Sequence, residues 1–179
     1  MDGVKFLALL TLLSNIFLGI FIVLFISKYL VKSKLWSRVW SILTKNSLKL
    51  SFVVALTATL GSLYFSEVRG FTPCILCWYQ RIFMYPLSII LGVALWKKTK
   101  DVWLYVLPLS LIGALIAAYH YYLQVTPTAI APCSTTGFSV SCNERFFTYF
   151  GYITIPWMSL SAFVLVTLLM FLQKAAVKK

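Results

Sequence analysis

Long apolar stretches dominate the chain and are separated by short polar segments. A helix needs about 20 residues to cross the roughly 30 Å hydrocarbon core of a bilayer. Five stretches approach or exceed that length, at residues 6–27, 50–66, 77–96, 102–123 and 153–173. Their apolar residues run continuously rather than alternating with period two, which favours helices over a closed barrel of strands. The pattern therefore predicts an all-α membrane protein with five spanning helices.

The composition agrees with this prediction. Hydrophobic residues make up 61% of the 179 residues and charged residues only 11%, against about 45–50% and about 25% in ordinary soluble domains. A soluble domain of this size leaves nearly a third of its chain surface exposed, and so much apolar surface would not stay in solution. Disorder requires low hydrophobicity and is excluded for the same reason. We therefore expect lipid to surround most of the chain.

The basic residues indicate the orientation of the spans. The chain has 16 Lys and Arg against 4 Asp and Glu, for a net charge of +12. Six basic residues lie in segment 28–49, three in the turn 97–101 and three in the tail 174–179, and all these segments share one side of the predicted membrane. The positive-inside rule then places the N-terminus outside and the C-terminus in the cytoplasm. Because the basic runs flank apolar spans, we expect lipid contact and no nucleic-acid binding.

Residues 1–49 are predicted to form an N-terminal anchor with a basic segment. The first apolar run is too long for a signal peptide, and its basic residues follow it rather than precede it. In the basic segment, Trp36, Val39, Trp40 and Leu43 recur at helical spacing. This spacing predicts a separate amphipathic helix in the inner interface, although a solvated basic loop is the simpler alternative.

Four cysteines, Cys74, Cys77, Cys133 and Cys142, lie on the predicted outer side. The location of all four cysteines on the oxidising side of the membrane suggests disulfide chemistry. The residues leave three interpretations open: two structural disulfides, a four-thiolate zinc site, or a redox-active Cys-x-x-Cys pair. Zinc modules usually repeat close cysteine spacings, whereas the second pair here is nine residues apart. Cys74 and Cys77 open a predicted helix, whose positive N-terminal dipole stabilises a thiolate.

Two further residues near the cysteines are candidates for chemistry. Arg81 follows Cys77 by one helical turn inside a predicted span, where a charge usually marks a functional site; the alternative is a side chain that snorkels to the outer headgroups. His120 lies near the outer end of span 102–123 and is predicted to face the same space as Arg81. Its alternative is an interfacial role among neighbouring tyrosines.

The motifs around the cysteines resemble those of a known family. The run Pro-Cys-Ile-Leu-Cys-Trp-Tyr-Gln-Arg at residues 73–81 resembles the signature of the DsbB family of disulfide bond formation membrane proteins, including its BdbC-like branch. The segment from Cys142-Asn143-Glu144-Arg145 through Ile155-Pro156-Trp157 and the spacing of His120, Gln124 and Cys133 are similar as well. The resemblance covers about residues 50–173. Its short loop between Cys133 and Cys142 is similar to the BdbC-like branch, whereas residues 1–49 lie outside it.

The resemblance implies a thiol:quinone oxidoreductase of the prokaryotic cytoplasmic membrane that generates disulfides de novo. Residues 50–173 would form a four-helix bundle around a quinone, ubiquinone or menaquinone, followed by a basic tail at 174–179. Cys133 would form a mixed disulfide with an extracytoplasmic DsbA-like thioredoxin-fold partner, and Cys142 would be its redox mate. Electrons would pass to Cys74 and Cys77, with Cys77, Arg81 and His120 at the quinone and no metal.

Two alternatives to this function remain. A vitamin K epoxide reductase-like protein runs similar chemistry, but its loop cysteines precede the Cys-x-x-Cys motif, and here the order is reversed. A non-catalytic membrane protein with two structural disulfides is the other.

Overall fold

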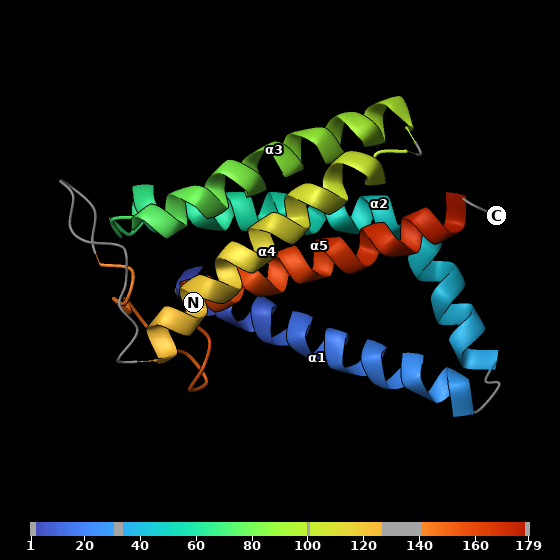
Figure 1. Cartoon of the computed structure of the whole chain (residues 1–179), viewed down its shortest axis with the longest axis horizontal. Coiled ribbons are helices and arrows are strands. Elements are labelled where there is room, and N and C mark those ends of the chain that lie inside the picture. The colour runs from blue at the N-terminus through green and yellow to red at the C-terminus, as the bar shows by residue number, and fades with distance from the viewer. Residues whose placement is uncertain (1–2, 31–33, 100, 127–140, 178–179) are drawn as a thin grey trace.

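The computed structural model describes residues 3–30, 34–99, 101–126 and 141–177, so that Cys133 lies outside the described residues. Within these ranges the chain is helical and has no named strand. Five α-helices and one π-helical turn follow one another along the chain (Figure 1). They are α1 (Gly3–Leu30), α2 (Lys34–Leu63), η1 (Tyr64–Val68), α3 (Ile75–Lys97), α4 (Trp103–Val125) and α5 (Ile155–Val177).

All five α-helices contain a stretch long and apolar enough to cross a membrane. The prediction of an all-α membrane protein with a four-helix bundle and an additional N-terminal helix is therefore confirmed. The bounds differ most at α2, which runs without a break from Lys34 and includes the segment predicted as a separate interfacial helix. No Gly or Pro interrupts residues 34–60, so nothing in the sequence ends the helix there. Figure 1 shows that the first part of α2 bends away from the bundle.

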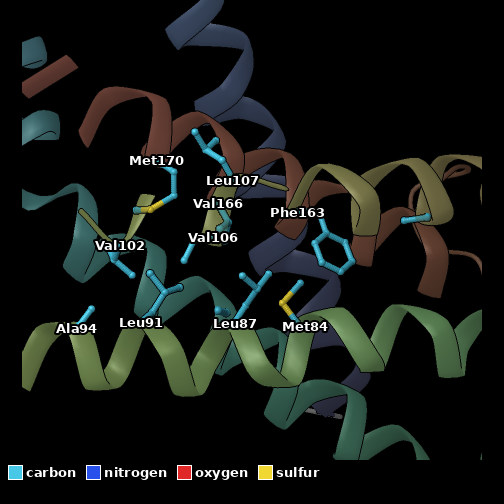
Figure 2. Close-up of a cluster of buried hydrophobic side chains, with 12 residues drawn as sticks. Met84, Leu87, Leu91, Ala94, Val102, Val106, Leu107, Phe163, Val166 and Met170 are labelled. Atoms are coloured by element: carbon cyan, nitrogen blue, oxygen red, sulfur yellow. The ribbon is translucent and has the colours of Figure 1, made fainter. Parts of the chain in front are cut away.

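The bundle core lies between α2, α3, α4 and α5. Figure 2 shows side chains of this core, among them Leu87 and Leu91 of α3, Val106 of α4 and Phe163 of α5, all fully buried. Lipid is as apolar as these side chains, so close packing rather than water exclusion must hold the helices together. Gly113 of α4 allows this packing, because a Cβ there would overlap the Phe163 ring.

One end of the bundle holds the cysteine motif and the other the basic turn. α3 begins at Ile75 and ends at Lys97, so the Cys-x-x-Cys motif and the lysine turn lie at opposite ends of this helix. The segment 141–154, which contains Cys142 and leads into α5, lies at the cysteine end (Figure 1). The side chains that the sequence singled out are thus gathered at one end of the bundle.

Candidate redox site

The Cys-x-x-Cys motif forms the N-terminal cap of α3. Cys74 has an extended backbone, and its sulfur accepts a hydrogen bond from the Cys77 backbone N–H at 3.4 Å. This cap satisfies one of the free N–H groups at the start of the helix. The sulfurs of Cys74 and Cys77 lie 3.2 Å apart and both residues are free thiols. Cys74 is buried, whereas Cys77 is half-buried.

A histidine lies directly beside Cys74. The Nε2 atom of His120 is 3.6 Å from the Cys74 sulfur and 3.1 Å from the Cys142 carbonyl oxygen. The Gln80 side-chain nitrogen is 2.9 Å from the Nδ1 atom of His120. Because that amide nitrogen can only donate, Nδ1 accepts and the ring proton sits on Nε2, where the Cys142 carbonyl and the Cys74 sulfur are both within reach. His120 itself is buried.

These contacts favour a thiolate at Cys74. Hydrogen bonding from the Cys77 thiol, followed by the hydrogen bond from His120, lowers the pKa of Cys74 to about 4, although burial opposes the shift. An ordinary thiol has a pKa of about 8.5. Cys74 is thus the anionic member of the reduced pair, and the Cys77 thiol donates to it.

The loop that contains Cys142 is fastened over this thiolate. Cys142 is disulfide-bonded and almost completely buried. The Gln124 side chain donates to the Glu144 carbonyl at 2.9 Å, and the Arg145 guanidinium donates to the Gln124 carbonyl. These bonds join the loop to the end of α4. Together with Cys74, Cys77 and His120 they line a small cleft of polar and apolar side chains, which we call the Cys74 cleft.

Cys77 also opens onto a second, larger space. This cavity of about 450 Å³, which we call the Cys77 cavity, is lined mainly by apolar side chains of α1, α2, α3 and α5. The segment 71–73 and Phe146 line it as well, at the end of the bundle that holds the cysteine motif. None of the described residues of α4 lines it, so His120 faces the Cys74 cleft instead. Cys77 contributes to both spaces and Cys74 only to the cleft.

Arg81 is the cation that lines the Cys77 cavity. Its Nε donates to the Ser62 hydroxyl at 3.0 Å and its Nη2 to the Ser62 carbonyl at 3.1 Å. The guanidinium also lies 5.1 Å from the centre of the Trp78 ring, and the Tyr85 hydroxyl reaches Ser62 at 3.4 Å. All these partners are neutral, so the guanidinium keeps its full charge beside an apolar space.

The structure brings most of the sequence-predicted residues together. Cys74, Cys77, His120 and the loop of Cys142 meet at the cleft, Arg81 lines the cavity, and Cys133 lies outside the described residues. His120 was expected at the quinone, but it contacts Cys74. Sequence reasoning missed Gln80 and Ser62. Gln80 stands inside the 73–81 motif and was open to notice, whereas Ser62 acts across two helices and leaves no local signal.

A metal ion is the other ligand to consider. The ligand atoms of Cys74, Cys77 and His120 lie within 4.8 Å of one another. With the Cys142 sulfur in a disulfide, as in this structure, that cysteine offers no thiolate to a four-cysteine site. The Cys77 cavity, in contrast, is apolar and suits an organic ring.

Comparison with known proteins decides the family. The family described as "Disulfide bond formation protein DsbB" matches residues 44–173, which is most of the chain. The chain belongs to the DsbB family. The resemblance drawn from the 73–81 motif is thereby confirmed. The first helix, α1, lies wholly outside the matched range.

Curated relatives of this DsbB-family chain bear names of the same kind. It is 51% identical over 126 residues to disulfide bond formation protein C of Bacillus subtilis, an alignment that covers 69% of this chain and 89% of that protein. It is 42% identical over 132 residues to a probable disulfide formation protein of Metapseudomonas resinovorans, covering 73% and 90% respectively. No solved structure matches. The protein is therefore a membrane protein of a family whose members form disulfide bonds.

Proposed function

We propose that the protein is a thiol:quinone oxidoreductase that reoxidises a DsbA-like thioredoxin-fold partner outside the cytoplasmic membrane. The observation that supports this most strongly is the position of the Cys-x-x-Cys pair between two unlike spaces. Cys74 lies at the Cys74 cleft beneath the Cys142 loop, and Cys77 opens onto an apolar cavity beside Arg81. Such a pair can take electrons from thiols on one side and release them on the other.

The Cys77 cavity fits a quinone by its size and chemistry. Ligand pockets typically measure about 300–1,000 Å³ and combine apolar walls with a few polar groups. Here the polar groups include Arg81, Ser62 and Tyr85, which hydrogen bonds join to one another. A bound ubiquinone or menaquinone would supply the oxidant, accepting two electrons and two protons from the cysteine pair. The residues that would hold it are Arg81, Ser62 and the apolar side chains around them.

Thiol–disulfide exchange supplies the electrons. We propose that a thiolate of the reduced partner attacks Cys133 in a Cys133–Cys142 disulfide, so that Cys142 leaves as a thiolate. The second partner thiol then attacks the mixed disulfide, which oxidises the partner and leaves the loop pair reduced. A loop thiolate next attacks Cys74 in a Cys74–Cys77 disulfide, and Cys77 leaves. The loop disulfide re-forms, and both electrons now reside on Cys74 and Cys77.

His120 and Gln80 would set the direction of this transfer. Gln80 holds the ring so that the Nε2 proton lies within reach of the Cys74 sulfur. A donor there stabilises the Cys74 thiolate, and a stabilised thiolate makes the Cys74–Cys77 disulfide a stronger oxidant. Electrons are then drawn from the loop pair to the buried pair.

Arg81 would act at the other sulfur. Its guanidinium remains charged at every physiological pH and is fixed by two hydrogen bonds to Ser62. A fixed cation in an apolar space stabilises negative charge without reorganisation. Here that charge would lie on the Cys77 sulfur and on a carbonyl oxygen of a bound quinone. With its basic segments in the cytoplasm, the molecule would present all four cysteines to the outside.

The test is steady-state oxidation of a reduced partner by the purified full-length protein in detergent. The substrates are a reduced DsbA-like thioredoxin-fold protein and either decylubiquinone or menadione. We expect partner oxidation to require quinone and to consume one quinone per disulfide formed, and Cys77→Ser to abolish it. Partner oxidation that proceeds equally without quinone, or no oxidation with either quinone, would contradict the proposal.

A further inference from the structure

The N-terminal helix α1 lies outside the family match, yet it forms part of the Cys77 cavity. The family match begins at residue 44, and the alignment with the Bacillus subtilis relative takes up 89% of that protein. Even so, α1 lines the cavity with five side chains, whereas α4, a helix of the matched region, lines it with none of its described residues. The α1 residues are Leu7, Leu10, Thr11, Leu13 and Ser14. Without them, the cavity would open toward lipid on that side.

Close packing holds this half of α1 against the bundle. A Cβ at Gly61 of α2 would lie 3.2 Å from a Leu7 methyl carbon, and a Cβ at Gly3 would lie 2.7 Å from the Tyr64 ring. Small residues at such contacts let helices approach closely in a membrane. The first half of α1 is therefore seated on α2 and η1 beside the cavity.

A polar contact fixes α1 against α5 at the same level. The Ser161 hydroxyl donates to the Asn15 side-chain oxygen at 2.8 Å, and the Asn15 amide nitrogen lies 3.5 Å from the Tyr152 hydroxyl. Asn15 follows Ser14 directly, so this contact holds the cavity-lining part of α1 in one rotation about its axis. The wall is thus a defined surface.

Ser14 has a hydroxyl without a partner in this wall. Its Oγ atom is buried and makes no hydrogen bond, whereas the neighbouring Thr11 hydroxyl donates to the Leu7 carbonyl. A buried hydroxyl left unpaired is unfavourable, and native proteins usually satisfy such groups. Ser14 lines the cavity, but its Oγ atom is itself covered in this structure, so a rotation about χ1 has to aim the hydroxyl at a ligand oxygen in that space. A quinone carries two carbonyl oxygens of this kind.

We infer that α1 is part of the quinone site of this protein, where Leu7 and Leu10 form an apolar wall and the Ser14 hydroxyl donates to a quinone oxygen. The inference rests on the proposed function and adds to it a fifth helix that determines quinone affinity. It assigns the N-terminal helix a role in the site in addition to membrane anchoring.

The test is quinone affinity, measured by isothermal titration calorimetry of decylubiquinone and menadione into the full-length protein in detergent. Leu10→Trp fills the cavity and should weaken binding by at least about tenfold, because it occupies space that the ring needs. Leu9→Trp is the matched control, since Leu9 is 41% exposed and does not line the cavity; it should change the affinity by less than about twofold. Ser14→Ala removes one hydrogen bond and should weaken binding by about fivefold.

A kinetic measurement separates binding from chemistry. In partner oxidation, Ser14→Ala should raise the KM for quinone and leave kcat nearly unchanged, because the cysteines and Arg81 are untouched. Each variant is checked for folding by its unfolding temperature and by the presence of the Cys142 disulfide, both of which should match the unaltered protein. If Leu10→Trp does not fold, Ser14→Ala alone decides.

The outcomes distinguish the inference from the function beneath it. If the unaltered protein binds neither quinone, the proposed function itself fails. If it binds quinone and Ser14→Ala and Leu10→Trp bind as tightly as Leu9→Trp, the inference about α1 is wrong and the proposed function stands. Weaker binding confined to the two cavity-lining variants supports the inference.

Discussion

The two cysteines of the Cys-x-x-Cys motif lie 3.2 Å apart but face very different surroundings. Cys74 is buried in a polar network in which His120, held by Gln80, points at its sulfur. Cys77 borders an apolar cavity of about 450 Å³ in which Arg81 is the cation. One side of the motif is built for hydrogen bonds and the other for an apolar ring beside a positive charge.

In the proposed function, this difference separates the two tasks that the motif performs. Thiol exchange needs a stable thiolate close to the loop, and Cys74 packs in one buried cluster with Cys142. Reduction of a membrane-dissolved acceptor needs an apolar site with a fixed charge, which the Cys77 cavity provides. Variants on one side should therefore change one task and leave the other intact.

The largest effect is expected from Cys142→Ala. Without its redox mate, Cys133 cannot form the loop disulfide, so a thiolate of the reduced partner has no loop disulfide to attack. Only an oxidised partner, whose disulfide the Cys133 thiolate can open, should leave a mixed disulfide on Cys133. Turnover should stop while the Cys77 cavity still binds quinone. Non-reducing electrophoresis with mass spectrometry of the adduct would detect it. If the partner is found on Cys74 in a Cys133→Ala variant, the proposed order of transfer is reversed.

The next effect is expected from Arg81→Met. Loss of the fixed cation should raise the activation free energy of quinone-dependent turnover by about 2–4 kcal/mol, if it resembles the loss of an oxyanion donor. Arg81→Lys should slow it less, since lysine keeps the charge but not the planar donor fork. Disulfide exchange between the partner and the loop pair should hardly change.

For the Arg81 variants, the rate of partner oxidation is measured as a function of quinone concentration. Disulfide exchange between the partner and the loop pair is measured separately, in a single turnover without quinone. Arg69→Met is the matched control, because Arg69 is exposed and does not line the cavity. Equal loss in both variants, or failure of Arg81→Met to fold, would assign Arg81 a structural role.

A smaller effect on the opposite side is expected from His120→Ala. In the unaltered reduced protein, alkylation of Cys74 should follow its thiolate, so the rate should stay constant above the pKa of about 4 and fall below it. Removing His120 removes a hydrogen bond that lowers the pKa of Cys74, so the midpoint should rise. At pH 5 the alkylation rate should drop by about tenfold.

Iodoacetamide labelling mapped by mass spectrometry measures that profile, and quinone affinity should stay unchanged in the same variant. Tyr119→Ala, at an exposed position next to His120, is the control. An unchanged alkylation profile combined with weaker quinone binding would place His120 at the quinone instead of at Cys74.

The smallest effect is expected from Ser62→Ala. Ser62 accepts a hydrogen bond from Arg81 through its hydroxyl and another through its carbonyl, and only the first is lost. The KM for quinone should rise by about fivefold, the equivalent of one hydrogen bond, while alkylation of Cys74 stays the same. Ser66→Ala, one turn further along and bonded to Glu67, is the control.

The spans and the cysteine motif were predictable because their signals are local. Apolar runs define helices in a membrane, and the cap at Cys74 follows from residues adjacent in sequence. A boundary was expected between the basic segment and the second span, but α2 runs through both. A helix without Gly or Pro continues through a change in polarity. Cys133 lies outside the described residues, so its predicted role is still a prediction.

The two surroundings of the motif were not predictable, because they depend on contacts between distant residues. Ser62 reaches Arg81 from another helix, and His120 turns toward Cys74 because Gln80 and the Cys142 carbonyl hold its ring. The N-terminal helix showed only an apolar pattern, and nothing local marks Ser14 as lining a cavity. Helix rotation and tilt decide which residues meet, and periodicity alone does not fix them.

One measurement tests the division between the two sides most directly. A Cys133→Ala/Cys142→Ala double variant keeps only Cys74 and Cys77 and is reduced, desalted and mixed anaerobically with decylubiquinone or menadione. The account predicts that one quinone is consumed for every two thiols lost, that the new disulfide maps to Cys74 and Cys77, and that Cys77→Ser in this background consumes none. A reduced pair that leaves both quinones unchanged would contradict the account, as would quinone consumption that persists without Cys77.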